Sequence, residues 1–416
     1  MFMEFISVIS SHPGPGENMT KAFGRCRFVT FIGAILFSTA SLMAEQSQDA
    51  TKTSVHLKSA EDLKNAIVKL DELFAEEYAK NQQASATIGI ISGDKLIWTK
   101  SYGLADIGNH TPATKDSVYR IASITKQFTA LMLLQLVQQG KVHLADPVRK
   151  YYPEIDKIPN PYSFAPSITL YQLATHTSGL SGGPYDNDAS ENGGPVADWD
   201  KILLSALPLV KYTNEPGTKF NYSNVGYAIL GEALSRAAGE PYIQYEKRHI
   251  LEPLGMEHSG FELNEEMKRN LARGYEVKGK STDPTMANSQ LYGRGYTVPN
   301  AGLFTSVTDL AHFLSFEMGY GPEEVLPRSV LANNFSQELA NGDLTQAYGL
   351  GFRIWRFGNL LAVGHGGSME GYYSQAYFNP SEHIGIVWLR NAQGDAGFDG
   401  VTLQGILKLL SSKGTE

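Results

Sequence analysis

Strand-like patterns lie at both ends of this sequence, and a long stretch with helical patterning separates them. Residues 86–91 and 96–102 predict a hairpin joined by a polar turn at 92–95. Four more short strands are predicted near the other end, at 347–354, 361–365, 373–379 and 384–390. Strands so far apart in sequence can pair only if the two ends of the chain meet. The pattern therefore predicts one antiparallel sheet that the two ends share.

Helical periodicity completes the fold prediction. Residues 59–82 form an amphipathic pattern, and a last helix carries Leu403, Ile406, Leu407 and Leu410 on one face. We expect an α/β (α+β) fold in which an antiparallel sheet is flanked by helices and joined by an all-helical subdomain. The expected catalytic domain is 45–416, with a sheet subdomain at about 59–122 and 300–416 and a helical subdomain at about 123–299. A polar, glycine-rich stretch at 181–195 predicts a long surface loop.

Composition excludes several classes of protein. Hydrophobic residues make up 42% of the 416 residues and charged residues 19%, which is enough apolar material for a large core. A net charge of −8 without a basic run argues against nucleic acid as a partner. The single cysteine, Cys26, excludes a disulfide framework. No His, Asp and Glu spacing suits zinc, and no nucleotide-binding glycine motif occurs, so neither a metal nor another cofactor is predicted.

The first 44 residues have the pattern of a targeting segment. Lys21, Arg25 and Arg27 precede an apolar run at 28–36, and small residues follow as far as Ala44. This order predicts a secretory signal peptide that begins at Met19, with residues 1–18 as an upstream extension. The apolar run is shorter than the roughly 20 residues of a spanning helix, although an uncleaved anchor is the alternative. We expect an exported protein, periplasmic or secreted, with no membrane span in the mature chain.

Three short motifs carry candidate chemistry, and they occur in the order Ser123-Ile124-Thr125-Lys126, Tyr222-Ser223-Asn224 and His365-Gly366-Gly367. Each motif is weak when taken alone. The SxxK pattern, for example, recurs at Ser92 and Lys95 in the predicted hairpin turn. The argument therefore depends on the three occurring together.

The first motif combines several catalytic groups in one helical turn. Ser123 opens a predicted helix, where a serine and a lysine three residues apart share a face. The Ser123 N–H at a helix start can hold the oxygen of a tetrahedral intermediate, while Lys126 serves as the base. Burial would lower the lysine pKa toward the working pH. The alternative is an ordinary N-cap serine beside a solvated lysine.

The other two motifs predict proton transfer and substrate binding. A lysine cation would favour the phenolate of Tyr222, which could then pass protons, and Asn224 offers a donor and an acceptor to a substrate amide or ester. Glycines after His365 let a substrate lie against the backbone, and the Ser368 N–H would complete the oxyanion hole. The alternatives are a core tyrosine beside a capping asparagine and a structural histidine.

Taken together, the motifs resemble the serine β-lactamase and penicillin-binding-protein superfamily, which carries a related SxxK set. The YxN motif is similar to that of the branch containing class C β-lactamases, D,D-carboxypeptidases and family VIII esterases. Further similar stretches lie at 173–180, 253–256 and 309–311, so the resemblance covers about residues 60–412. It implies a β-lactamase/transpeptidase-like fold.

The resemblance also implies roles for individual residues. Ser123 would be the nucleophile, Lys126 its base partner, Tyr222 the proton relay and Asn224 a substrate binder, with His365 in place of the third-motif lysine. Histidine is only partly charged at pH 7, and Gly366 lacks a hydroxyl, which weakens two features that bind a carboxylate.

The expected function is an exported serine hydrolase that forms an acyl-serine intermediate, with esterase or amidase activity favoured over efficient β-lactamase activity. Its expected partner is a small-molecule ester, amide or peptidoglycan-like substrate. The alternatives are a D,D-carboxypeptidase, a class C-like β-lactamase, a non-catalytic penicillin-binding or interaction module, and a scaffold whose 181–195 loop binds a partner.

Overall fold

The computed structural model describes residues 59–80, 85–162, 164, 167–183, 193–279, 281–291, 293, 295–331, 339–340, 345–394 and 402–411. These residues all belong to one compact unit, Val55–Glu416. The predicted extension and signal peptide at 1–44 lie outside the described residues, as does the centre of the 181–195 loop.

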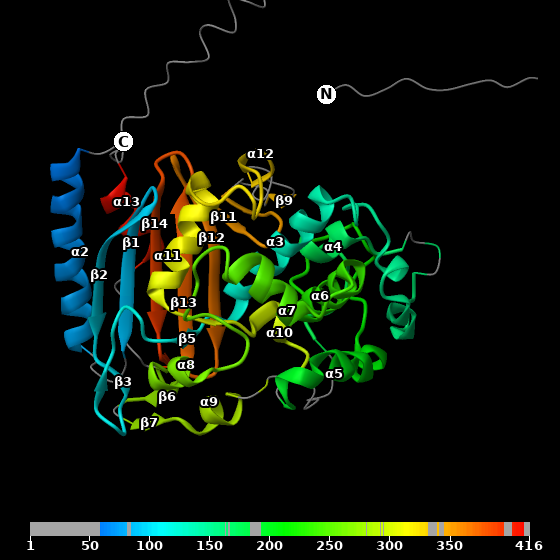
Figure 1. The fold of residues 1–416 in the computed structure, drawn as a ribbon, viewed down its shortest axis with the longest axis horizontal. Helices are drawn as coiled ribbons and strands as arrows, with labels where there is room; N and C mark the ends of the chain where they lie inside the picture. The colour runs from blue at the N-terminus through cyan, green and yellow to red at the C-terminus, as the bar shows by residue number, and fades with distance from the viewer. Residues whose placement is uncertain are drawn as a thin grey trace, which may run out of the picture. The chain divides into compact units, whose positions relative to one another are not determined.

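An eight-stranded sheet built from both ends of the chain forms the framework of the fold (Figure 1). Its strand order is β2-β1-β14-β13-β12-β11-β10-β9, and the paired neighbours run antiparallel. The strands are β1 Ala86–Ser92, β2 Lys95–Tyr102, β9 Leu339–Ala340, β10 Gln346–Tyr348, β11 Arg353–Phe357, β12 Leu360–Met369, β13 Tyr372–Asn379 and β14 Ile384–Arg390. Because the early strand β1 pairs with the late strand β14 over its whole length, the predicted sharing of one sheet is confirmed.

Helices cover both faces of this sheet because both faces are apolar. Strand β1 is buried along almost its whole length, with Ile88 and Ile90 in one core cluster and Ile91 in another. Helices α2 (Ala60–Lys80) and α13 (Leu403–Leu410) contribute to the first cluster, and α11 (Val307–Ser315) contributes to the second. Figure 1 shows α2 beside the sheet edge and α11 across the sheet face.

The second cluster continues into the helices between residues 122 and 331. Helix α3 (Thr125–Gln138) is buried on nearly every side, so it is a core helix rather than an amphipathic surface helix. Its neighbour α6 (Asn224–Ala238) is buried over its first three turns. The other α-helices are α4 Leu170–Ala174, α5 Trp199–Ala206, α7 Tyr242–Glu246, α8 Glu265–Arg269, α9 Thr285–Ser289, α10 Val298–Ala301 and α12 Arg328–Leu331. The short 3₁₀ and π segments are η1 Ala122–Ile124, η2 Val148–Lys150, η3 Pro153–Lys157, η5 Val196–Asp198, η6 Leu207–Leu209, η7 Lys247–Leu251 and η8 Phe316–Tyr320.

Two details of the fold differ from the prediction. The region predicted as all-helical contains β6 (Tyr275–Lys278) and β7 (Ser281–Asp283), which join β15 (Ala392–Gly394) in a three-stranded sheet. The single strand predicted at 347–354 is two strands, β10 and β11, because Gly351 adopts a φ of 78° between them. A local pattern cannot reveal β6, whose parallel partner β15 lies more than a hundred residues away.

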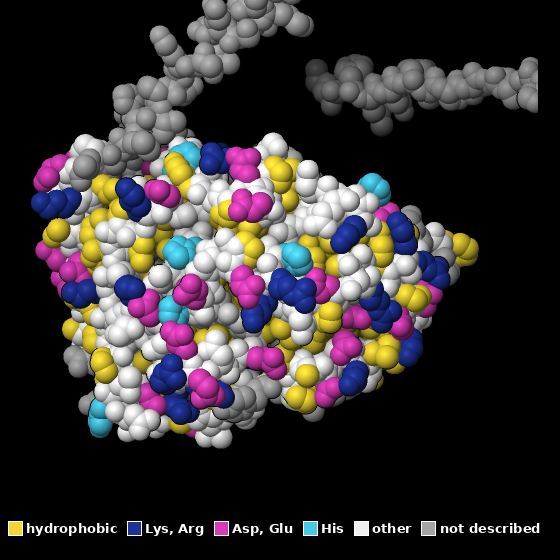
Figure 2. All heavy atoms as spheres, viewed as in Figure 1, with side chains coloured by type: hydrophobic (Ala, Val, Ile, Leu, Met, Phe, Trp, Pro, Cys, Tyr) yellow, Lys and Arg dark blue, Asp and Glu magenta, His cyan; other side chains and the backbone are white. Residues whose placement is uncertain are grey.

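Two small strand pairs lie outside the main sheets. Strand β3 (Leu104–Asp106) pairs with β4 (Thr111–Pro112), and β5 (Tyr119–Arg120) pairs with β8 (Phe304–Thr305). The second pair helps to position the candidate nucleophile, because β5 ends just before Ser123. The face seen in Figure 2 mixes acidic and basic side chains. In the part of the chain that the structure describes, no helix has the length and apolar character needed to cross a bilayer.

Candidate active site

The candidate nucleophile, Ser123, lies in a tight turn that leads into the buried helix α3. It occupies η1, the 3₁₀ turn that ends directly before the α-helix begins at Thr125. The preceding residue, Ala122, has a φ of 46°, a left-handed conformation that is uncommon for alanine. Thr125 Oγ1 holds this turn by donating to the Ala122 carbonyl at 2.7 Å and accepting from the Leu303 N–H at 3.2 Å. Ser123 is left half-buried, with its hydroxyl facing Lys126.

Lys126 is fully buried and joins three separate segments of the chain. Its Nζ lies 3.1 Å from Ser123 Oγ, 2.9 Å from Asn224 Oδ1 and 3.1 Å from the Asn300 carbonyl oxygen. These partners belong to η1, to the first residue of α6 and to α10. A buried amine with three oxygen partners is hydrogen-bonded rather than solvated, so the alternative of a solvated lysine does not describe this site.

Tyr222 reaches the same place from the loop before α6. Ser223, rather than Asn224, caps that helix by accepting from the Gly226 N–H at 3.0 Å, which leaves the Asn224 amide free to face Lys126. The Lys126 Nζ lies 4.8 Å from the centroid of the Tyr222 ring.

The protonation state of Tyr222 differs from the expectation. Burial raises the pKa of Tyr222 to about 12, although its interactions with the Ser123 hydroxyl and with Arg353 oppose the rise. The expectation of a favoured phenolate is wrong, because desolvation of the charged form outweighs the nearby cation.

His176 positions this tyrosine, and the sequence analysis did not single it out as a site residue. Its Nδ1 accepts from the Ser223 N–H at 3.0 Å, and its carbonyl accepts from the Asn221 N–H at 2.7 Å. The His176 and Tyr222 ring centroids are 4.2 Å apart. Burial, assisted by the Lys126 cation, holds the pKa of His176 well below its usual value, so the ring is neutral at pH 7.

His365 is present in the site, but it does not carry the partial charge that the sequence suggested. It lies in β12, fully buried, with Nε2 3.2 Å from the Tyr348 hydroxyl and Nδ1 against the Gly366 carbonyl. Burial first, and then the Lys126 and Arg353 cations, hold its pKa well below the usual value. A neutral imidazole satisfies both contacts by donating through Nδ1 and accepting through Nε2. The expectation of a histidine that is partly charged at pH 7 is therefore wrong.

Arg353 is a cation near the third motif, and no motif in the sequence marked it. It lies in β11 directly opposite Gly364 of β12 and opposite Tyr348 of β10. Its guanidinium carbon is 5.4 Å from the centroid of the Tyr222 ring. Gly351, just before this strand, is the sequence feature that could have pointed to it. An added Cβ at this glycine would lie 2.8 Å from the Lys126 carbonyl oxygen. That glycine lets the start of β11 approach the catalytic helix.

The glycines of the third motif bring β12 against the nucleophile turn. A Cβ at Gly367 would lie 2.1 Å from the Ile121 carbonyl oxygen, so no other residue fits there without movement of the backbone. At Gly366 the nearest atoms, at 3.0 Å, belong to the flexible side chain of Gln375. The register between β11 and β12 ends at Gly364, so residues 365–369 are paired with β13 but not with β11.

The two backbone groups predicted for the oxyanion hole, the N–H groups of Ser123 and Ser368, lie on these two segments. The Ser123 N–H has no hydrogen-bond partner among the described residues. Ser368 follows Gly367 in the part of β12 that packs beside η1, and its side chain is exposed. The arrangement is suited to a carbonyl oxygen that enters between turn and strand.

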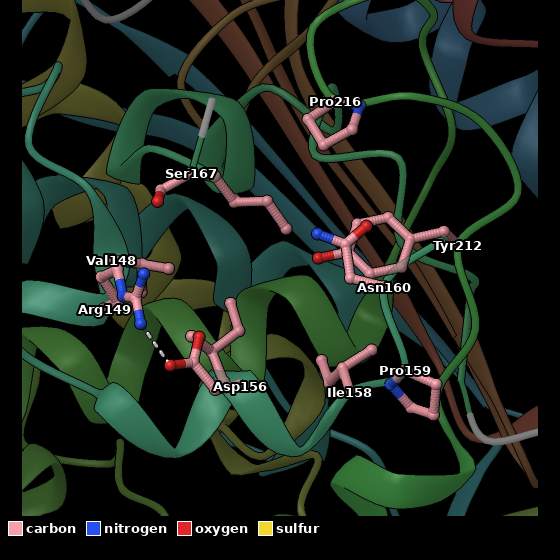
Figure 3. Close-up of a pocket in the computed structure, with 11 residues that line it drawn as sticks. Val148, Arg149, Asp156, Ile158, Pro159, Asn160, Ser167, Tyr212 and Pro216 are labelled. Carbon is pink, nitrogen blue, oxygen red and sulfur yellow. Dashed lines mark hydrogen bonds and ion pairs between the residues drawn. The ribbon is translucent and has the colours of Figure 1, made fainter. Parts of the chain in front are cut away.

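A hollow of about 420 Å³ lies elsewhere in the helical region (Figure 3). It is lined by residues of η2 and η3 together with Tyr212 and Pro216, and an ion pair between Arg149 and Asp156 forms part of its wall. No residue of the three motifs lines it. The candidate site residues therefore lie around Lys126 and not at this hollow. Among the described residues, no group of three or more His, Cys, Asp and Glu side chains could hold a metal ion.

Comparisons with known proteins agree with this arrangement. The family model described as Beta-lactamase matches residues 70–410, which is most of the chain. The chain belongs to the beta-lactamase family. Its family and its fold are those of serine hydrolases related to beta-lactamases and penicillin-binding proteins.

One curated relative of this beta-lactamase-family chain comes from a slime mould, Dictyostelium discoideum. Beta-lactamase-like protein 2 of Dictyostelium discoideum is 31% identical over 336 residues, covering 78% of this chain and 59% of that protein. The chain spans about three fifths of the length of the curated relatives that it matches first.

Among solved structures, the octameric penicillin-binding protein homologue from Pyrococcus abyssi matches with a TM-score of 0.69 and 26% identity, covering 84% of this chain and 78% of that one. A class C beta-lactamase matches in fold with a TM-score of 0.69 and 20% identity, covering 87% and 100%.

Substitution of Gly367 tests whether close approach of β12 to the nucleophile turn depends on this glycine. We expect Gly367→Ala to lower the free energy of unfolding by about 1–3 kcal/mol, because its methyl group meets a backbone carbonyl that cannot rotate away. Urea denaturation measures the change. Gly366→Ala is the matched control, and it should cost less because Gln375 can move. Equal losses in the two variants would contradict this account of Gly367.

Proposed function

We propose that this protein is an exported serine hydrolase that cleaves an ester or amide bond through an acyl-enzyme on Ser123. One observation carries the proposal: Ser123 Oγ lies 3.1 Å from the buried Lys126 amine, which also donates to the Asn224 and Asn300 carbonyl oxygens. That set of partners supports a mechanism in which Lys126 is the base.

Lys126 can act as a base only in its neutral form, and these oxygen partners suit that form as well as the ammonium. A neutral amine has two N–H donors and one lone pair, whereas an ammonium has three donors. Asn224 Oδ1 and the Asn300 carbonyl can only accept, so they take the two N–H bonds. The Lys126 ammonium donates to Ser123 Oγ, whereas in the neutral form the Ser123 hydroxyl can donate its proton to the amine lone pair. This supports Lys126 as the general base that removes the proton as Ser123 attacks.

The remaining groups support a complete proton path. Ser123 Oγ bonds to the substrate carbonyl carbon while its proton passes to Lys126, and the carbonyl oxygen becomes an oxyanion held by the N–H groups of Ser123 and Ser368. Tyr222 is protonated, because its pKa is about 12, so its hydroxyl can donate a proton to the leaving group and recover one from Lys126. The C–O or C–N bond then breaks. Water then attacks the acyl carbon and gives up a proton to the Lys126–Tyr222 pair, the bond to Ser123 Oγ breaks, and that oxygen takes the proton back as the acid leaves.

The geometry of the site supports a type of bond to be cleaved and does not specify the rest of the substrate. An ester, an amide or a peptidoglycan-like peptide each presents the carbonyl that the mechanism requires. D,D-carboxypeptidase and beta-lactamase activities use the same chemistry and remain the alternative. The expected preference for neutral substrates rested on the missing cation of the third motif. Arg353 now stands beside that motif, so the preference loses its original argument.

Export is proposed from sequence alone. A basic segment, a short apolar run and small residues up to Ala44 support a signal peptide beginning at Met19 and a periplasmic or secreted product.

The nucleophile is tested by Ser123→Ala, which removes the attacking oxygen and should abolish both ester turnover and covalent labelling by a fluorophosphonate. Intact-protein mass spectrometry and a chromogenic ester assay measure the two effects. The control is Ser92→Ala, since Ser92 and Lys95 pair across the β1–β2 turn and form the other SxxK pattern. A folded Ser92→Ala protein without activity would reverse the assignment. Failure of the unaltered protein to label or turn over would support a non-catalytic module.

The proton relay is tested by Tyr222→Phe, which removes the phenolic oxygen and keeps the ring that packs on His176. We expect kcat to fall by about 10²–10⁴-fold, the usual effect of losing a positioned acid or base. Steady-state kinetics with an ester of a poor leaving group measures the loss. Turnover within twofold of the unaltered protein would show that Tyr222 carries no proton.

A further inference from the structure

Glu246 is a fully buried carboxyl group that the proposed mechanism does not use. It ends α7, a helix that packs against α3 and α6. Among the described residues neither of its carboxyl oxygens makes a well-formed hydrogen bond, and the polar side chain that interacts with it is Tyr242. A buried carboxylate without such bonds is costly. Burial accordingly raises the pKa of Glu246 to about 8, although Tyr242 opposes the rise, so the group is mostly a neutral acid at pH 7.

A chain of hydrogen bonds connects this acid to the segment that holds Lys126. The Tyr242 hydroxyl lies 2.7 Å from Thr129 Oγ1 of α3, and Thr129 Oγ1 donates to the Pro299 carbonyl of α10 at 2.6 Å. The next carbonyl of α10, that of Asn300, accepts from Lys126 Nζ at 3.1 Å. Lys126 and Thr129 are three residues apart and share a face of α3. Helix α3 therefore binds α10 through two adjacent carbonyls.

The directions of these bonds specify where the proton of Glu246 must lie. Thr129 has one hydroxyl proton, and it goes to the Pro299 carbonyl, which can only accept. Tyr242 must then donate its own proton to Thr129. A hydrogen bond between Tyr242 and Glu246 consequently requires a proton on the carboxyl group. The bond directions and the burial thus agree on a neutral acid.

The titratable groups around Glu246 leave burial as the main cause of its protonation. Tyr242 and Tyr245, the titratable side chains that face it, belong to its own helix. The neighbouring elements α3, α6 and η7 carry charged side chains whose contacts lie elsewhere: Lys126, Glu232, Arg236, Lys247, Arg248 and His249.

Ionisation of Glu246 would break the chain at its first bond. A carboxylate only accepts, so the Tyr242 proton would turn toward it and away from Thr129. A threonine in a helix can donate to the carbonyl one turn before it, so Thr129 would lose the contact that keeps its hydroxyl aimed at Pro299. Because α10 is a single turn, it would then be held less firmly beside Lys126.

We propose that Glu246, as a neutral acid, is a positioning residue for the catalytic lysine. Through Tyr242 and Thr129 it keeps α10 in the place where a carbonyl of that turn holds the Lys126 amine. The effect on turnover rests on the proposed hydrolase function, whereas the effect on α10 rests on the hydrogen bonds alone.

The first test measures whether folding keeps Glu246 protonated. The unfolded chain releases this proton at the usual carboxyl pKa, so the acid makes the unaltered protein less stable as the pH rises from about 5 to 8. Glu246→Gln keeps a donor for Tyr242 and cannot ionise. We expect its Tm, relative to that of the unaltered protein, to rise by about 3–8 °C between pH 5 and 9.

Glu257→Gln is the matched control for this measurement, because Glu257 is exposed. A relative Tm of Glu246→Gln that changes by less than about 1 °C over this range, or an equal change in Glu257→Gln, would overturn the inference.

Hydrogen exchange measures whether the acid positions α10. At pH 9 a peptide spanning 298–303 should exchange about 3- to 10-fold faster in the unaltered protein than in Glu246→Gln, and at pH 6.5 the two should exchange equally. Tyr242→Phe removes the hydroxyl from the chain and should show the faster exchange at both pH values. Equal exchange of this peptide in all three proteins at pH 9 would contradict the role of Glu246.

Turnover connects the inference to the proposed function. The ratio of kcat for Glu246→Gln to kcat for the unaltered protein should rise about 3- to 10-fold between pH 6.5 and 9, with little change in KM, because a group with a pKa of about 8 is mostly ionised at pH 9. The ratio cancels the titration of Lys126, which both proteins share. A merely structural role would leave the ratio constant, and that result would overturn the positioning of the lysine.

The three measurements separate this inference from the proposed function. A protein that hydrolyses no ester at any pH would contradict the hydrolase, whereas its Tm and exchange profiles would still decide whether Glu246 holds α10. An active hydrolase with flat profiles would contradict Glu246 alone.

Discussion

The buried amine of Lys126 is the interaction on which the site depends. It donates to oxygen atoms of the turn before α3, of the start of α6 and of α10, and the last two partners lie 98 and 174 residues from the lysine in sequence. An unpaired amine in this position would be costly, so the three segments must meet for the fold to be stable. The contact that assembles the fold is also the one that would activate Ser123. Stability and catalysis therefore constrain the same atoms.

Burial sets the charge of the other groups around this amine. Desolvation keeps His176 and His365 neutral and Tyr222 protonated, and the two cations add to the effect on the histidines. The neutral rings then act through hydrogen bonds: His176 holds the loop that carries Tyr222, and His365 bonds to Tyr348. Permanent positive charge remains with Arg353, on the neighbouring strand.

Local sequence patterns predicted the fold more completely than they predicted the protonation states of the site residues. The strands of the main sheet and the flanking helices follow from residue periodicity, and the pairing of Ser123 with Lys126 follows from helical spacing. The positions of Arg353 and of the Asn300 carbonyl near the site arise from strand and helix contacts between distant segments, so no local motif could reveal them. The protonation of His365 and Tyr222 depends on burial in the folded protein, which residue identity alone does not specify.

A crystal structure of the protein inactivated by an aryl phosphonate would test the central claim most directly, because the adduct imitates the tetrahedral intermediate. We predict phosphorus bonded to Ser123 Oγ, one phosphonyl oxygen between the N–H groups of Ser123 and Ser368, and Lys126 still bound to Asn224 and the Asn300 carbonyl. An adduct on another residue, or on Ser123 with its phosphonyl oxygen turned away from both N–H groups, would contradict the account.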